Sequence, residues 1–73
     1  MRPSDRYHKW IEWSDRDGVY LGRCPDVITD IHGSDPVHLY GELCTVVDEV
    51  LVELEQSKRT LPQPLTRPMR EVA

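Results

Sequence analysis

The alternation of side-chain types along the chain predicts three short β-strands in its first half. The stretch "YHKWIEW" (residues 7–13) is rich in aromatic side chains and alternates in type, which is typical of a strand. "VYLGRC" (19–24) predicts a second strand, and the β-branched "VITDIH" (27–32), closed by a glycine, predicts a third. The intervening "SDRDG" (14–18) has the composition of a hairpin turn. Three strands in close succession predict an antiparallel meander.

Both faces of this sheet are expected to carry bulky apolar side chains. The expected sets are Trp10, Tyr20, Cys24 and Ile28 on one side, and Ile11, Trp13, Leu21 and Ile31 on the other. A single helix covers only one face of a sheet. We therefore expect another chain, or the C-terminal segment, to cover the second face.

Helical spacing replaces the alternation in the second half, where we predict one helix from about Pro36 to Gln56 or Ser57. Ser34 or Asp35 can cap its start, and proline suits the first turn, where its missing N–H costs nothing. The apolar residues recur at the i, i+3, i+4 positions of one face. These are Tyr40, Leu43, Cys44, Val47, Val50, Leu51 and Leu54, with Glu42, Asp48, Glu49, Glu53 and Glu55 on the other side.

The predicted elements make one small α+β domain, a three-stranded antiparallel meander with one long helix packed on one face. We expect residues 1–6 to be a flexible N-terminus and residues 7–57 to be the folded domain. Residues 58–73 contain three prolines, which leave room for a short edge strand at 61–66 followed by a disordered tail. A chain of 73 residues buries a modest share of its surface, so a lone monomer is marginally stable.

The net charge of −4 is unevenly distributed along the chain. Residues 10–56 contain eleven acidic and two basic residues, a net charge of −9, whereas residues 1–9 carry +2 and residues 57–73 carry +3. An acidic body of this kind repels nucleic acid and attracts a basic partner. Improved solubility alone is an equally good explanation of the charge.

Localisation is expected to be cytoplasmic. The N-terminus lacks the apolar region of a signal peptide, and no apolar run is long enough to span a bilayer, so we expect no membrane association. Two cysteines are too few for a disulfide framework, so we expect reduced thiols.

Candidate catalytic groups are present, but their spacing favours other roles. A two-metal nuclease needs several converging carboxylates, whereas only Glu12 and Asp30 fall within predicted strands. The thiols and imidazoles show no ligand spacing; they are Cys24, Cys44, His8, His32 and His38. We therefore expect no catalysis, metal or cofactor. Direct RNA binding through the basic ends and the aromatic residues is a weaker alternative.

The order of these features resembles the HicB family of antitoxins, over about residues 7–66. The resemblance rests on a Tyr-led strand, an Asp-Gly hairpin whose second strand ends at Pro, a short strand ending in Gly, a capped helix and a Leu-Pro segment. In this sequence they are "YHKWIEW", "DGVYLGRCPD", "DIHGSDPVHLYGEL" and "TLPQPL". Asp35 stands where the family usually has a Thr cap, and His38-Leu39 replace a more usual acidic-Ala pair.

The resemblance implies a truncated RNase H-like fold without nuclease activity. It also implies a small basic partner toxin of the HicA type, which cleaves mRNA and whose catalytic histidine and RNA-binding surface the antitoxin covers. Many members carry a further DNA-binding domain, for which the residues after the helix are too few, so we expect no DNA binding. The residues expected to contact a partner are Trp10, Trp13, Asp15, Asp17, Tyr20, Glu42, Asp48 and Glu49.

Two main functions stay open at this point, and a metal-dependent nuclease that uses Glu12 and Asp30 is the weakest alternative. The first is an antitoxin that masks a basic toxin and forms a homo-oligomer through a sheet face or an edge strand. The second is a stand-alone homo-oligomeric domain with a scaffold or ligand-binding role and no toxin.

Overall fold

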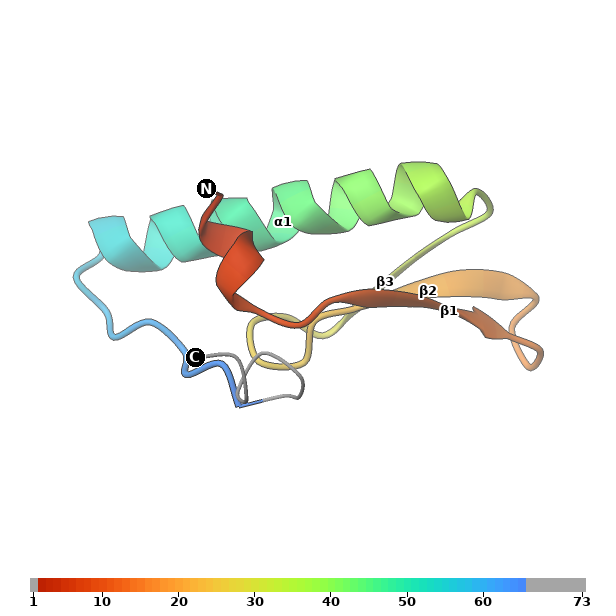
Figure 1. Cartoon of the computed structure of the whole chain (residues 1–73), viewed down its shortest axis with the longest axis horizontal. Coiled ribbons are helices and arrows are strands. Elements are labelled where there is room, and N and C mark those ends of the chain that lie inside the picture. Colours follow the sequence, from red (N-terminus) through yellow and green to blue (C-terminus); the bar gives the residue numbers. More distant parts are fainter. Residues whose placement is uncertain (1, 66–73) are drawn as a thin grey trace.

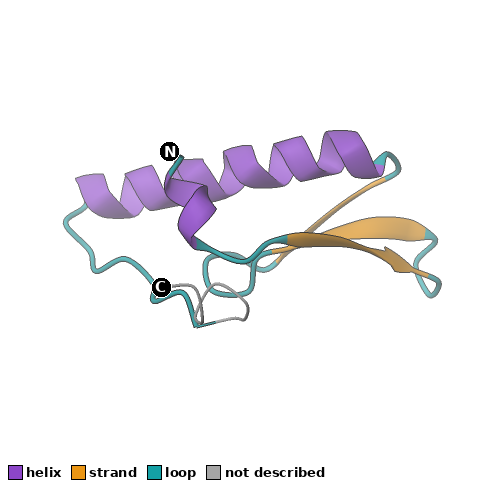
Figure 2. Ribbon diagram, viewed as in Figure 1, coloured by secondary structure: helices purple, strands orange, loops and turns teal. Residues whose placement is uncertain are grey.

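A computed structural model describes residues 2–65 and places one long helix over one face of a three-stranded sheet (Figure 1). The elements are a short 3₁₀ helix η1 (Pro3–Arg6), the strands β1 (Trp10–Ser14), β2 (Val19–Arg23) and β3 (Asp30–Gly33), and the helix α1 (Pro36–Gln56). The sheet order is β1-β2-β3, and both pairings are antiparallel. Figure 2 shows the two layers, with helix on one side and strands on the other. The predicted α+β meander with one covering helix is confirmed.

The turn between β1 and β2 is closed as its sequence predicts. Gly18 has a φ of +67°, in the left-handed region that glycine adopts at little cost. Its backbone N–H donates to the carbonyl oxygen of Ser14 at 2.8 Å. This four-residue loop sets Ser14 opposite Val19, and thereby fixes the register of the hairpin.

That register corrects the expected division of side chains between the two sheet faces. Trp13 lies opposite Tyr20, and residues directly opposite each other in a ladder share a face. Leu21 lies opposite Glu12 and is therefore on the other face, together with Trp10. The prediction that grouped Tyr20 with Trp10, and Leu21 with Trp13, was wrong because alternation within a strand does not fix its register against a neighbour.

The hydrophobic core lies between the sheet and α1. Its buried members are Tyr7, Cys24, Leu43, Val47 and Leu51, and Ile11, Val27, Ile28, Ile31 and Leu61 pack against them. At the middle of β2, Gly22 leaves space for its neighbours, because a Cβ there would lie 3.0 Å from Ile31 Cγ1 and 3.4 Å from Ile11 Cδ1. The face of the sheet that carries Ile11 and Ile31 is therefore the one that α1 covers.

All three strands are shorter than the sequence predicts, β2 only by its last residue, Cys24. β1 begins at Trp10 because Tyr7 turns inward, where it is 1% exposed and its hydroxyl donates to the carbonyl oxygen of Pro62 at 2.6 Å. β3 begins at Asp30 because the backbone N–H groups of Val27 and Ile28 both donate to the carbonyl oxygen of Cys24 in a turn.

The helix has the predicted bounds. Asp35 caps its start, because the side chain accepts hydrogen bonds from the backbone N–H groups of Val37 and His38 at 3.0 and 3.3 Å. Its buried face includes Leu39, which the predicted apolar stripe omitted, whereas Tyr40 is 42% exposed. Leu39 is buried because β3 ends at Gly33, where the missing side chain admits the leucine.

The structure also describes part of the segment on either side of the predicted domain. Pro3–Arg6, expected to be part of a flexible N-terminus, form η1, which packs against α1 with Ser4 buried. Residues 57–65 contain no strand. The last residue of the expected edge strand, Thr66, and the expected disordered tail lie outside the described residues. None of the helices within residues 2–65 has the length and apolar character to cross a bilayer.

Candidate functional site

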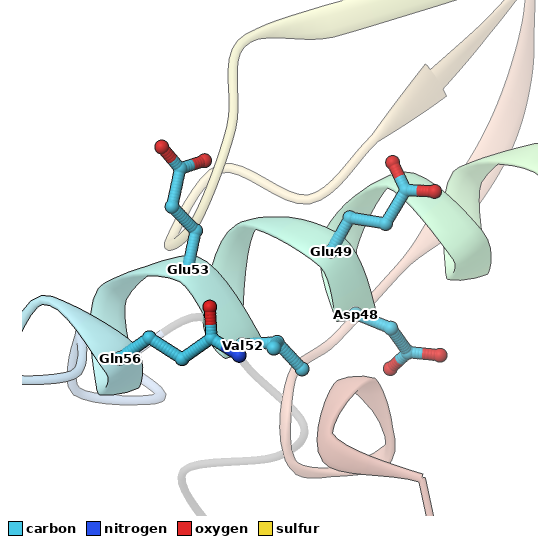
Figure 3. A pocket seen from close by; sticks show the side chains of 5 residues that line it. All are labelled: Asp48, Glu49, Val52, Glu53 and Gln56. Atoms are coloured by element: carbon cyan, nitrogen blue, oxygen red, sulfur yellow. The ribbon is translucent and has the colours of Figure 1, made fainter.

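A shallow groove on α1 is the strongest candidate for a binding site among the predicted contact residues. It has a volume of about 280 Å³ and is lined by Asp48, Glu49, Val52, Glu53 and Gln56. All five come from consecutive turns of the helix, and Figure 3 shows Glu49 and Glu53 projecting in the same direction. The groove is therefore an acidic surface with one apolar side chain, Val52, which is 44% exposed.

Helical periodicity puts this groove on the side of α1 away from the sheet. Leu43, Val47 and Leu51 are buried at intervals of four, so Glu49 and Glu53 fall on the opposite side of the helix and are exposed. Glu42 continues the same outer face two turns earlier, where the Nε2 atom of His38 lies 3.5 Å from its Oε1 atom. The outer face of α1 thus carries a row of carboxylates.

Asp48, at the edge of the groove, is bound by the N-terminal segment. The Arg2 side chain contacts the Oδ2 atom of Asp48 through both Nε and a terminal nitrogen, each at 2.6 Å. The backbone N–H of Ser4 donates to the Oδ1 atom at 2.8 Å. Partial burial favours a higher pKa for Asp48, but these hydrogen bonds and the guanidinium charge outweigh it and hold the pKa below its ordinary value.

Glu49 and Glu53, in contrast, take part in no ion pair within residues 2–65. Two unpaired carboxylates one turn apart attract the ammonium or guanidinium group of an incoming side chain. The exposed surface of Val52 offers contact to the aliphatic part of such a lysine or arginine. The groove can therefore bind a basic segment of another protein.

A second group of the predicted contact residues lies at the hairpin tip. The rings of Trp13 and Tyr20 pack edge to face at 5.0 Å, and the Trp13 Nε1–H donates to Asp15 at 2.6 Å. Asp17 accepts a hydrogen bond from the Ser14 hydroxyl at 3.3 Å, which holds the turn. The tip lies near the start of α1, whereas the groove lies on its second half, so the two regions do not form one site (Figure 1).

The third region is the sheet face that α1 does not cover, which we call the open face. Trp10 packs against the His8 ring at 5.0 Å and donates from Nε1 to Glu12 at 3.0 Å. Arg23 forms ion pairs with Glu12 at 2.5 Å and Asp30 at 3.5 Å. Within residues 2–65, the Nε–H of Arg23 has no hydrogen-bond acceptor. Its contact with Glu12 is therefore an ion pair without hydrogen-bond geometry.

A hollow of about 310 Å³ adjoins these groups on the open face. It is lined by Asp17, Val19, Leu21 and His32. The last three belong to the ends of β2 and β3 that lie nearest the hairpin, and the register places Leu21 opposite His32. Two aliphatic side chains thus line the hollow together with an imidazole and a carboxylate.

The groups considered for catalysis occupy ordinary structural positions. Glu12 and Asp30 both contact Arg23, which lies between them on the central strand. Cys24 and Cys44 are buried, and burial raises the pKa of the Cys24 thiol, which keeps it protonated. Within residues 2–65, no three His, Cys, Asp or Glu side chains gather in a way that would hold a metal ion.

The residues predicted to contact a partner thus lie in three separate regions: the outer face of α1, the hairpin tip and the open face. The helix groove contains Asp48 and Glu49 of the predicted contact residues, together with Glu53, which the sequence placed on the same acidic side of the helix. The groove adds Val52 and Gln56. The contacts of Arg2 and Ser4 with Asp48 have no local sequence signal, because they join residues more than forty positions apart.

In comparisons with known proteins, no family model, no curated protein and no solved structure matches the chain.

Proposed function

We propose that this chain is a non-catalytic protein-binding domain that binds and masks a small basic mRNA-cleaving toxin, in the manner of a HicB-like antitoxin. The observation that carries the proposal is the acidic outer face of α1, where Glu49 and Glu53 are exposed and unpaired within residues 2–65. The net charge of −9 over residues 10–56 supports it, because that charge attracts a basic protein over a distance.

Masking of this kind requires charged and apolar side chains in the right positions, and it requires no catalytic reaction. The acidic face accelerates the encounter with a basic partner, while close contacts set how long the complex lasts. The exposed apolar surface of Val52 in the acidic groove supplies such a contact. A toxin held there would have its RNA-binding surface neutralised by the carboxylates and covered by the helix.

Growth rescue tests the proposal. The chain is co-expressed with a small basic HicA-type toxin, and wild-type protein is expected to restore growth. The double variant Glu49→Lys/Glu53→Lys is expected to lose the rescue. The matched control Glu55→Lys makes the charge change of either single substitution at an exposed helix position outside the groove, and it is expected to keep the rescue. Absence of rescue and of binding by the wild-type chain would overturn the proposal.

A second candidate function is a stand-alone homo-oligomeric domain with a scaffold role. The observation that favours it is the open face, which no segment within residues 2–65 covers although it presents Trp10, Val19 and Leu21. Under this function the chain self-associates but has no effect on growth arrest by the toxin. Because both functions include self-association, growth rescue in cells that co-express the chain and the toxin is the measurement that separates them.

A further inference from the structure

The N-terminal segment brings a basic group to the acidic groove of α1 from within the chain. Arg2 contacts the Oδ2 atom of Asp48 through Nε and a terminal nitrogen, and the backbone N–H of Ser4 donates to the Oδ1 atom. Figure 3 shows the Asp48 carboxylate on the side of α1 where η1 lies. Of the three carboxylates that line the groove, Asp48 is the one that forms an ion pair within residues 2–65.

This contact shows how the groove receives a guanidinium group. Two nitrogens of Arg2 share one oxygen of Asp48, so the planar fork of an arginine fits where a single ammonium group would make one contact. Glu49 and Glu53 line the same groove and form no ion pair in this part of the chain. A basic segment that reaches the groove therefore meets one carboxylate that is occupied and two that are free.

The N-terminal segment is held by contacts weak enough to be displaced. The Arg2 side chain is 53% exposed, and an ion pair at such an exposed position contributes little to stability. Ser4 is fully buried, yet its hydroxyl has no hydrogen-bond partner within residues 2–65. A buried hydroxyl without a partner costs free energy. Both features lower the free energy that opposes release of η1 from α1.

We propose that residues 2–6 compete within the chain for the acidic groove, and that a basic partner displaces Arg2 and places an arginine of its own on Asp48. This competition rests on the proposed function, because it requires that the partner bind the outer face of α1. Tyr7 directly follows η1 and is buried in the hydrophobic core. The displaced segment therefore stays tethered beside the groove.

A tethered competitor sets a threshold on the charge of the partner. Its effective concentration near the groove is roughly millimolar, as for other short flexible connections. A protein that offers a single arginine gains too little at Asp48 to displace Arg2. A segment with several cations also binds Glu49 and Glu53, and this second gain allows it to displace the competitor. The groove thus selects strongly basic partners over weakly basic ones.

Binding of an octa-arginine peptide to two matched variants tests the competition. Arg2→Ala removes the competitor and is expected to tighten binding at least about threefold, because no displacement precedes binding. Arg6→Ala makes the same charge change in the same short helix, and Arg6 forms no ion pair within residues 2–65. It is expected to alter the dissociation constant by less than about 1.5-fold. Calorimetric titration at about 0.15 M salt measures both constants. Equal effects of the two substitutions would overturn the competition.

A double-mutant cycle locates the competition at Asp48. In the wild-type chain, Asp48→Asn removes a contact with the peptide and the hold of the competitor together, so the dissociation constant should change by less than about twofold. In Arg2→Ala, the same substitution removes only the contact and should weaken peptide binding at least about threefold. Additive effects of the two substitutions would contradict the proposal.

The side-chain NMR signal of Arg2 reports displacement in the wild-type chain. Its Nε–H donates to Asp48 at 2.6 Å, which should separate the signal from those of solvated arginines, and Arg2→Ala identifies the signal by removing it. Unlabelled peptide added to the ¹⁵N-labelled chain is expected to move the signal to the position of a solvated arginine. A signal that stays in place while the peptide binds would overturn the proposal.

Failure of the competition and failure of the proposed function give different results. If the peptide binds neither the wild-type chain nor Arg2→Ala, the outer face of α1 does not bind basic segments, and both proposals fail. If the peptide binds both with the same dissociation constant, the competition alone fails. Growth rescue then still measures whether the chain masks a toxin.

Discussion

The two faces of the sheet are built from the same three strands but differ in composition and packing. The covered face places Ile11 and Ile31 on either side of Gly22, beneath a helix that contributes fully buried leucine and valine side chains. The open face alternates Trp10 and Leu21 with the charged groups around Arg23. The first arrangement excludes water and stabilises the fold, whereas the second leaves polar groups paired at the surface.

This difference indicates which substitutions should change the free energy of unfolding and which should change the binding of a partner. A buried apolar group in a close-packed layer contributes by burial and dispersion, so its loss leaves a cavity. A surface ion pair contributes little, because both groups are well hydrated when the pair is broken. Matched substitutions on the two faces of this small domain should therefore have unequal effects.

The largest difference is expected from leucine truncation. Leu43→Ala, in the helix layer over the covered face, removes a side chain of 0% exposure and is expected to lower the free energy of unfolding by about 3 kcal/mol. Leu21→Ala, on the open face, is expected to lower it by less than about 1 kcal/mol. Urea denaturation of both variants measures the two losses. Equal losses would contradict the account of two unlike faces.

Glycine substitution provides the next largest effect. Gly22→Val places branched carbons against Ile31 and Ile11 and is expected to destabilise the domain by about 2 kcal/mol. Gly41→Ala is the control, because a Cβ at this exposed helix position meets nothing within 4 Å, and it is expected to stabilise by about 0.5–1 kcal/mol. Thermal unfolding monitored by circular dichroism measures both changes. A Gly22→Val variant as stable as wild type would mean that α1 does not pack Ile11 and Ile31 closely against β2.

The contact between the N-terminal segment and α1 gives a smaller, pH-dependent effect. Because the pKa of folded Asp48 lies below its ordinary value of 3.8, its ionised form favours folding. This contribution is complete well above pH 3.8 and is lost as the pH falls through the folded-state pKa. Asp48→Asn is therefore expected to destabilise by about 0.5–1 kcal/mol at neutral pH, and to differ little from wild type near pH 2.

The neighbouring Glu49→Gln serves as the control for this effect, since Glu49 is exposed and forms no ion pair within residues 2–65. Its stability should match that of wild type at both pH values. Urea titrations at each pH measure the differences. A deficit of Asp48→Asn that is as large near pH 2 as at neutral pH would show that the charge of Asp48 is not involved.

The smallest effect is expected on the open face. Arg23→Met removes both ion pairs but keeps an unbranched side chain over the strand, and it should change the free energy of unfolding by less than about 0.5 kcal/mol. Differential scanning calorimetry at low protein concentration measures this change without a contribution from self-association. A loss of about 2 kcal/mol would show that these ion pairs stabilise the sheet as strongly as core packing does.

The elements of this fold were predictable from local signals. The Asp35 cap, the proline after it and the helical spacing of apolar residues determine α1, and the Asp17-Gly18 turn determines the hairpin. These signals act between residues close in sequence, where propensity and pattern are informative. The order of elements and the class of the fold followed from them.

Features that depend on distant residues were not predictable in this way. The register that brings Tyr20 onto the face of Trp13 depends on a four-residue loop whose length alternation does not reveal. The packing of η1 on α1 depends on Asp48, which lies more than forty residues from Ser4. The acidic groove was predicted in part, because the carboxylates on α1 follow from periodicity whereas its boundary depends on three-dimensional packing.

The most direct test of the central claim, that the outer face of α1 binds a basic partner, is amide chemical-shift mapping of the ¹⁵N-labelled chain during titration with an octa-arginine peptide as a basic probe. The peptide is expected to move the amide signals of Glu49 and Glu53 on α1 and to leave those of Val19 and Leu21 on β2 in place. Shifts on β2 as large as those on α1 would contradict the claim.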